Sequence, residues 1–303
     1  MSAYADTHTV GYRGKFYQIH TNTGELCERQ FNLKKNWCVM VSPSTIGLHM
    51  VYNQLFITSK SDIYSVDIIR KKIKWNIPLH NMHKVLFHYP VIVTLSKDHV
   101  LSGYDFFSGY PLWKKNTHYT GLFETNGSVW VKTSRGIEQL DVVSSNTSNP
   151  IALDHPVQYL AGDDVFLFLQ FDNGLVHYNR LNNQKVPMGT GFRILDIAAD
   201  YVLVGNDDFQ QLRSFSNHVI SDNIQEALFK VHSQHNVVFA YVKNNEMALI
   251  DVKGSVFYNF TPTQNKVKMG YNYKLNNKLR GFYGNQQLWT LKQINTQLSD
   301  HDT

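Results

Sequence analysis

The stretch that decides the fold is residues 54–76, which read QLFITSKSDIYSVDIIRKKIKWN. Apolar and polar residues alternate with a period of two on either side of Ser61 and Asp62, and β-branched and aromatic residues dominate one face. This alternation predicts a strand, a tight turn and a second strand that ends at Asp67. A short connection then leads into a third strand, which carries Trp75.

The same order of strands recurs along the chain. Residues 91–114 read VIVTLSKDHVLSGYDFFSGYPLWK, with Asp105 and Trp113 in the equivalent places. The equivalent positions of all the repeats are His20, Asp67, Asp105, Asp141, Asn179, Phe215 and Asp251. They lie 36 to 38 residues apart, except for a first step of 47, which we attribute to an insertion around residues 34–46. A repeat of about 40 residues is typical of a four-stranded propeller blade.

We therefore predict an all-β chain, a seven-bladed β-propeller of four-stranded blades. It would occupy residues 1–303 as a single domain, with short flexible tails at about residues 1–7 and 294–303. The segments 15–31 and 281–292 each resemble part of a blade. Joined in one blade, they would close the ring and leave no long exposed sheet edge.

The composition excludes two classes of protein. Charged residues make up 17% of the chain and aromatic residues 13%, whereas a disordered chain has few aromatic residues and a high net charge. No apolar run reaches the roughly 20 residues that a membrane-spanning helix needs. The first residues show no basic start followed by an apolar stretch, so we expect no signal peptide and a cytoplasmic location. Export by a route that leaves no N-terminal signature stays open.

Cys27 and Cys38 are the only cysteines. Two cysteines cannot form a disulfide framework for a chain of this length, and their spacing matches no zinc motif. We expect two small buried thiols.

The repeat resembles the PQQ-like, quinoprotein-type β-propeller repeat. The residues that carry the resemblance are Ile63-Tyr64-Ser65-Val66-Asp67 with Trp75, and Gly103-Tyr104-Asp105 with Ser108-Gly109 and Trp113. The segment Lys15 to His20 with Thr23-Gly24 is a weaker match. The WD repeat, the other blade type of similar length, would show Gly-His and Trp-Asp dipeptides, and neither occurs. The resemblance implies a fold; the non-catalytic relatives of this repeat are assembly platforms, and no quinone or calcium site is evident.

Two groups of residues are weak candidates for chemistry. His80, His83 and His88 could hold a metal ion, as could His232 and His235, but no Asp, Glu or Cys stands beside them at ligand spacing. We therefore predict no metal site and no cofactor.

Two pairs of acidic residues also invite a functional interpretation. Asp163 with Asp164 and Asp207 with Asp208 stand on either side of the second strands of their blades. Neighbouring residues on a strand point to opposite faces, so neither pair can act as a catalytic dyad. A turn in which Asp accepts backbone N–H bonds fits better. We keep all four as candidates for partner binding.

The charge is distributed unevenly along the chain. Residues 1–118 carry a net charge of +7, residues 119–223 carry −6 and residues 224–303 carry +4. Such a division suits oriented docking onto a protein partner. The densest basic run consists of Arg70, Lys71, Lys72 and Lys74. A solvated turn is its ordinary interpretation, and we keep the four residues as candidates for contact with an acidic protein, a phospholipid or nucleic acid. This run is too short to favour nucleic acid as the main partner, whereas contact with a membrane surface stays open.

These observations favour a non-enzymatic protein-interaction scaffold or adaptor, a subunit of a larger assembly. The alternative is an enzyme or a small-ligand binder that uses the central channel or one face of the propeller.

Overall fold

The computed structural model describes residues 7–12, 15–29, 35–198, 201–206, 209–222, 224, 226–232, 237–243, 246–250, 256–260, 269–275, 278–284 and 287–290. These residues are strands and the turns between them, arranged in antiparallel sheets within two compact units. None of the described residues forms a helix with the length and apolar content that crossing a membrane requires.

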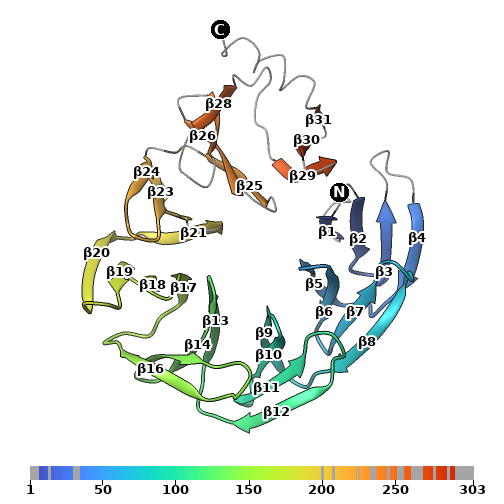
Figure 1. Cartoon of the computed structure of the whole chain (residues 1–303), viewed down its shortest axis with the longest axis horizontal. Helices are drawn as coiled ribbons and strands as arrows, with labels where there is room; N and C mark the ends of the chain where they lie inside the picture. Colours follow the sequence, from blue (N-terminus) through green and yellow to red (C-terminus); the bar gives the residue numbers. More distant parts are fainter. Residues whose placement is uncertain are drawn as a thin grey trace. The chain divides into compact units, whose positions relative to one another are not determined.

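Unit 1 covers residues 1–114 and 269–303, and most of its sheets have four strands (Figure 1). The first sheet contains β1 (Thr7–Tyr12), β2 (Lys15–His20), β3 (Glu25–Arg29) and β4 (Lys35–Met40). The second contains β5 (Thr45–Val51), β6 (Gln54–Ser59), β7 (Asp62–Asp67) and β8 (Lys72–Pro78). The third contains β9 (Met82–His88), β10 (Val91–Ser96), β11 (Val100–Asp105) and β12 (Pro111–Asn116). A three-stranded sheet contains β29 (Met269–Leu275), β30 (Lys278–Gly284) and β31 (Gln287–Thr290).

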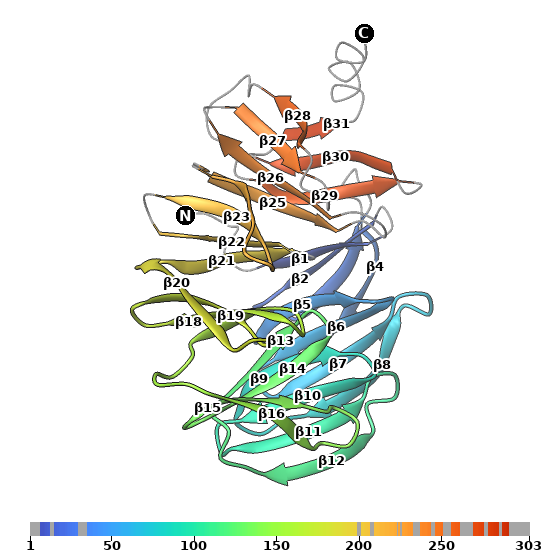
Figure 2. The ribbon, with the colours of Figure 1, turned by 60° about the vertical axis from the view of Figure 1, so that its left-hand side comes forward.

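Unit 2 covers residues 115–268 and holds four sheets of four strands, each a simple meander (Figure 2). The first contains β13 (Gly121–Thr125), β14 (Ser128–Thr133), β15 (Gly136–Leu140) and β16 (Thr147–Ala152). The second contains β17 (Tyr159–Gly162), β18 (Phe166–Phe171), β19 (Gly174–Asn179) and β20 (Gln184–Thr190). The third contains β21 (Arg193–Ala198), β22 (Tyr201–Gly205), β23 (Gln210–Ser214) and β24 (Val219–Ser221). The fourth contains β25 (Glu226–His232), β26 (Val237–Lys243), β27 (Glu246–Ile250) and β28 (Val256–Phe260).

Where their side chains are described, sheets that follow one another within a unit pack face to face. Ile19 of the first sheet and Ile57 of the second belong to one buried cluster, and Phe56 of the second shares another with Ile92 of the third. The second strands β6, β10 and β22 are therefore buried on both faces, which explains why they are short apolar runs in the sequence. The fourth strands β8 and β12 are largely exposed.

The Asp that recurs in the repeat closes the turn between the third and fourth strands. The Oδ1 atom of Asp67 accepts hydrogen bonds from the backbone N–H groups of the residues two and three positions further on, at 3.0 and 2.8 Å. Asp105 does the same at 3.1 and 2.7 Å, and Asp141 at 2.9 and 3.2 Å. This Asx-type turn is the physical reason for the repeated residue.

The predicted all-β architecture of four-stranded antiparallel sheets is confirmed, but seven blades and a blade shared between the two ends are not. The described strands form eight sheets, of which seven have four strands. The N-terminal strands β1 to β4 complete a sheet by themselves, and β29 to β31 form a separate one. Residue 7, expected in a flexible tail, begins β1. The other tail residues lie outside the described residues.

The expected insertion around residues 34–46 is wrong as well. Residues 35–40 form β4, the fourth strand of the first sheet, and β5 begins at Thr45. His20 ends the second strand β2, whereas the positions predicted to be equivalent to it lie at or just after the ends of third strands, as Asp67 does in β7. Counted from the end of β3 at Arg29, the step to Asp67 is 38 residues, like the others.

The two cysteines are not free thiols. Cys27 of β3 and Cys38 of β4 are directly opposite each other in the antiparallel ladder, with Cα atoms 4.1 Å apart, and they form a disulfide. Cys27 is fully buried and Cys38 is exposed. The expectation of two buried thiols failed because β4 was not predicted, and without β4 nothing places the two residues in register.

Candidate interaction surface

Four turns lie at one end of two neighbouring sheets in unit 1. In a meander of four antiparallel strands, the turn between the first two strands and the turn between the last two lie at the same end. In the second sheet these turns contain Tyr52 and residues 68–71, and in the third sheet they contain Tyr89 and residues 106–110. The sequence therefore brings large aromatic residues from separate turns to one end of the two sheets.

Four aromatic rings, which we call the aromatic platform, meet at this end: Tyr52, Tyr89, Phe106 and Phe107. The ring centroids of Tyr52 and Tyr89 are 5.4 Å apart, and those of Tyr89 and Phe107 are 5.8 Å apart. Phe106 is fully buried beneath them, with its ring 6.0 Å from Tyr52 and 5.9 Å from Tyr89. All these contacts are edge-to-face, the arrangement that the ring quadrupole favours.

The other three rings of the platform remain open to solvent. Tyr52 is 68% exposed, Tyr89 48% and Phe107 49%. Ile69 and Tyr110, which belong to the same set of turns, are exposed by 87% and 73%. An isolated exposed apolar residue needs no explanation, but adjoining exposed rings mark a candidate interaction site.

Hydrogen bonds fix the backbone beneath the rings. The N–H of Phe106 donates to the carbonyl of Pro90 at 3.0 Å, and the N–H of Phe107 donates to Oδ1 of Asp105 at 3.1 Å. The indole Nε1–H of Trp75 donates to the carbonyl of Phe107 at 2.7 Å. The platform is therefore held in place before any partner arrives, which lowers the entropy cost of binding.

The predicted basic run borders the platform. Arg70, Lys71, Lys72 and Lys74, which we call the basic turn, are all exposed, on the turn between β7 and β8 and on β8 itself. The Nζ atom of Lys74 lies 5.8 Å from the ring centroid of Phe107, within the range of a cation–π interaction. The predicted basic residues therefore lie beside aromatic residues that were not predicted to form a site.

The nearby carboxylates are occupied by their own turns. Asp67 accepts the N–H of Arg70, and this bond is the main reason that its pKa is lowered. The hydroxyl of Ser108 donates to Asp105 at 2.6 Å and is the main cause of the lowered pKa of that carboxyl. Both groups are ionised at neutral pH. The side chain of Arg70 lies 3.9 Å from Asp67, at the edge of ion-pair range, so most of the positive charge of the basic turn is available to a partner.

The acidic candidates have structural roles where they are described. The Oδ1 atom of Asp163 accepts the N–H groups of Val165 and Phe166, both at 2.7 Å, which confirms the turn interpretation. The carboxylate of Asp164 accepts a hydrogen bond from the Ser128 hydroxyl. Asp207 and Asp208 lie outside the described residues.

The histidine candidates do not form a metal site in the described part of the chain. His80 lies before β9, His83 on β9 and His88 at its end. Within the described residues, one group of three potential metal ligands has its ligating atoms within 4.8 Å of one another, and it consists of Glu25, Cys27 and Cys38. His232 is described only in its backbone, and His235 lies outside the described residues.

The platform was not predicted from the sequence because its residues lie in separate turns. Its residues come from different turns of two repeats: Tyr52 and Tyr89 stand in equivalent turns, two residues before β6 and β10, whereas Phe107 lies in the turn between β11 and β12, and the sequence does not show that these turns meet. Two signals were available: a Tyr recurs at the same place before β6 and β10, and aromatic residues follow a strand directly in Asp105-Phe106-Phe107. A turn ordinarily favours Gly, Asn, Asp, Ser and Pro, so bulky rings there suggest contact with a partner.

Comparisons with known proteins support a β-propeller-like fold. A computationally designed protein, Ika8, matches 93% of this chain and 95% of its own, with a TM-score of 0.63 and 11% identity. BamB from Moraxella catarrhalis matches 93% of this chain and 96% of its own, with a TM-score of 0.58 and 11% identity. Hsv2 from Kluyveromyces lactis matches 84% and 95%, with a TM-score of 0.55 and 12% identity.

At these identities the likeness shows the fold alone. No protein-family model matches the sequence, and no curated protein does. The resemblance to the PQQ-like repeat therefore stays an interpretation of the residues that carry it.

Proposed function

We propose that this chain is a non-enzymatic interaction scaffold or adaptor whose aromatic platform and basic turn bind an acidic segment of a partner protein. The single observation behind the proposal is the set of three exposed rings, fixed on a buried fourth ring and bordered by four cations. Protein interfaces are enriched in Tyr, Phe and Arg at their energetic centres.

The charge at this site supports an acidic partner. The basic turn presents four positive side chains, and the carboxylates of Asp67 and Asp105 are held by the turns that they close. A partner segment with Asp or Glu next to apolar side chains could bind the basic turn and the aromatic platform at the same time. Its acidic groups would meet the basic turn, and its apolar groups would cover Tyr52, Tyr89 and Phe107.

The rigidity of the surface supports binding rather than catalysis. The backbone of the platform is tied by hydrogen bonds to Pro90, Asp105 and Trp75. A rigid set of aromatic anchors loses little entropy when a partner binds. The groups that surround the platform are lysines, an arginine and engaged carboxylates, and they suit recognition of charge.

The test is affinity purification of the full chain from its native source, followed by mass spectrometry. Three baits are compared: the wild type, a platform variant with Tyr89→Ser and Phe107→Ser, and a control with Leu181→Ser. Leu181 is 80% exposed and lies on a turn of unit 2. We expect a stoichiometric protein partner with the wild type and the control, and its loss with the platform variant.

Three outcomes would contradict the proposal. The first is recovery of a lone chain at every salt concentration. The second is a partner that the platform variant retains as well as the wild type does. The third is capture of RNA or anionic lipid in place of a protein, because these would use the basic turn without the rings.

A further inference from the structure

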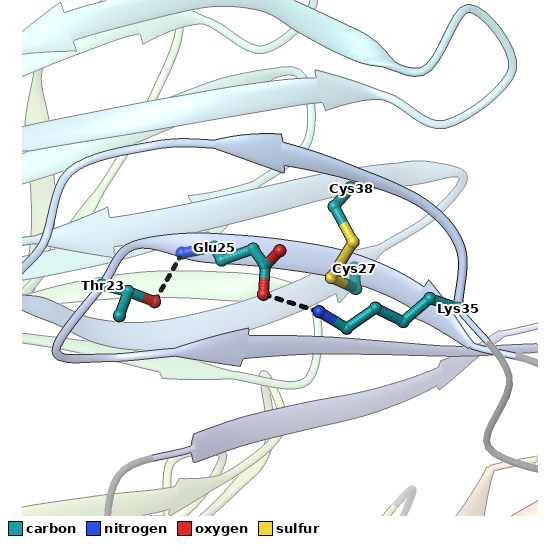
Figure 3. Close-up of a disulfide and its surroundings, with 5 residues drawn as sticks. All are labelled: Thr23, Glu25, Cys27, Lys35 and Cys38. Carbon is teal, nitrogen blue, oxygen red and sulfur yellow. Dashed lines mark hydrogen bonds and ion pairs between the residues drawn. A yellow bond between two sulfur atoms is a disulfide. The ribbon is translucent and has the colours of Figure 1, made fainter.

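A second site lies around the disulfide, on the face of the first sheet that is turned away from the second sheet (Figure 3). Glu25 and Cys27 are two residues apart on β3 and therefore project to the same face. Cys38 lies opposite Cys27 on β4, and Met40 lies opposite Glu25. One face of a two-stranded ladder thus carries two sulfurs, a carboxylate and a thioether.

The ligating atoms of Glu25, Cys27 and Cys38 already converge. They lie within 4.8 Å of one another. Zinc binds thiolate sulfur at about 2.3 Å and carboxylate oxygen at about 2.0–2.2 Å, so a tetrahedral ion would need its two sulfurs roughly 3.8 Å apart. Because the two cysteines are directly opposed across the ladder, rotation of their side chains supplies that separation without movement of the strands.

We infer that Cys27, Cys38 and Glu25 form a redox-controlled zinc site. In the oxidised chain the two sulfurs are bonded to each other and bind no metal. Two molecules of a small thiol reduce the disulfide: they transfer two electrons and two protons to the sulfurs and become a disulfide themselves. Zn²⁺ then displaces the two thiol protons and binds both thiolates and the Glu25 carboxylate, with water in the fourth position.

The exposure of the two cysteines fits this sequence of steps. Cys38 is exposed, so a reductant can reach the disulfide from solvent, whereas Cys27 is buried and anchors the pair to the sheet. A pair of cysteines in a reducing compartment is more often a metal ligand than a disulfide. The cytoplasmic location expected from the sequence is such a compartment.

Lys35 would compete with zinc for the Glu25 carboxylate. Its Nζ atom lies 2.9 Å from Oε2 of Glu25, and both side chains are partly exposed (Figure 3). Zinc must displace this lysine from Glu25, so removal of the lysine should tighten zinc binding, whereas removal of the carboxylate should weaken it.

The experiment titrates the full chain with Zn²⁺ against a chromophoric chelator, before and after reduction and anaerobic removal of the reductant. We expect one equivalent of Zn²⁺ in the reduced chain and none in the oxidised chain. Glu25→Gln should weaken binding at least about tenfold, the lower end of the effect of removing groups around a bound metal. Lys35→Gln should tighten it by roughly two- to fivefold, the range of one exposed ion pair.

Two further variants make the assignment specific. Cys38→Ser removes one of the two thiolates and should lower the sulfur-to-metal charge-transfer absorption that Co²⁺ gives when it replaces zinc in a thiolate site. Glu138→Gln, which removes a carboxylate on β15, should leave the affinity unchanged. Far-ultraviolet circular dichroism checks that each variant retains its strands.

Several results would overturn the zinc site. One is Zn²⁺ binding by reduced wild type that is no tighter than binding by reduced Cys38→Ser. Another is equal affinity of Glu25→Gln and the wild type. A third is a disulfide that small thiols reduce only in denaturant, because the site then could not form in the folded chain.

Discussion

Glu25 and Glu28 stand three residues apart on β3 and therefore project to opposite faces of the first sheet. Glu28 is buried, and its carboxylate accepts hydrogen bonds from Tyr17 and Lys15, both at 3.1 Å, and from Asn36 at 2.8 Å. Burial alone would raise the pKa of Glu28, but these donors outweigh it and lower the pKa. The charge is thus held in the interior by its partners.

We therefore expect Glu28→Ala to lower the free energy of unfolding by about 2 kcal/mol or more, because it leaves the buried Tyr17 hydroxyl without an acceptor. Urea denaturation measures this change. The matched control is Glu25→Ala, which removes a carboxylate from the exposed face of the same strand and should change stability little. Equal effects of the two substitutions would show that the buried network adds nothing.

Gly109 lies against the ring of Trp75, which donates a hydrogen bond to the carbonyl of Phe107. Its φ of +72° is in the left-handed region, and a Cβ atom placed there would lie 2.8 Å from Cδ2 of the Trp75 ring. We expect Gly109→Ala to destabilise the chain by about 1–2 kcal/mol and to displace Trp75 from the carbonyl of Phe107. Thermal unfolding measures the first effect. Loss of the captured partner measures the second, and normal partner binding by this variant would show that Trp75 does not position the platform.

The structural roles of some of these residues could be predicted from the sequence, and those of others could not. The recurrence of Asp67, Asp105 and Trp75 was visible, and the structure supplies the cause: a capped turn and a ring packed over it. The pairing of Cys27 with Cys38 was hidden, because it depends on the register of two strands of which only one was predicted. Register depends on partners across the ladder, which a single strand does not specify.

The capped turns give three sheets the same response to acid. The pKa values of Asp67, Asp105 and Asp141 are lowered by hydrogen bonds from the turns that these residues close. A carboxyl whose pKa is lower in the folded chain stabilises that chain above its unfolded pKa of about 3.9. That stability is lost as the pH falls through the lower, folded value.

We expect the melting temperature to fall below about pH 4, and to fall less in a variant that carries Asn at all three positions. Asn keeps an oxygen that can accept the turn hydrogen bonds but does not titrate. The measurement is thermal unfolding between neutral and acid pH, with Asp154→Asn, an exposed residue near β16, as the control. An unchanged acid response in the triple variant would assign the effect to other carboxylates.

The strand rhythm was predictable because the strands obey a period of two and their turns recur at 36 to 38 residues. The number of sheets was not. Residues 35–40 read KNWCVM and are half exposed, so they lack the continuous apolar character that marks the second strands. Without that strand the N-terminal sheet looked like part of a blade, which led to the expectation of a shared closing blade.

For the chain as a whole, the charge follows the division into units. Unit 1, residues 1–114 and 269–303, has a net charge of +8, and unit 2, residues 115–268, has −3. The platform and the basic turn belong to the positive unit. The β-propeller-like fold explains the low fraction of charged residues, because sheets that pack on both faces need apolar side chains on both. That one propeller domain spans all 303 residues stays a prediction.

This charge makes the salt dependence of partner binding the sharpest test for the whole chain. Opposite charges accelerate encounter, and ions in solution screen that attraction. We expect the association rate of the captured partner to fall by about tenfold or more between low and high salt, with a smaller change in the dissociation rate.

Lys71→Glu with Lys72→Glu should lower the association rate at low salt and flatten its salt dependence. Lys185→Glu, an exposed residue on β20, should do neither. If both variants behave alike, the attraction comes from the net charge of the chain, and the basic turn does not direct the partner to the platform.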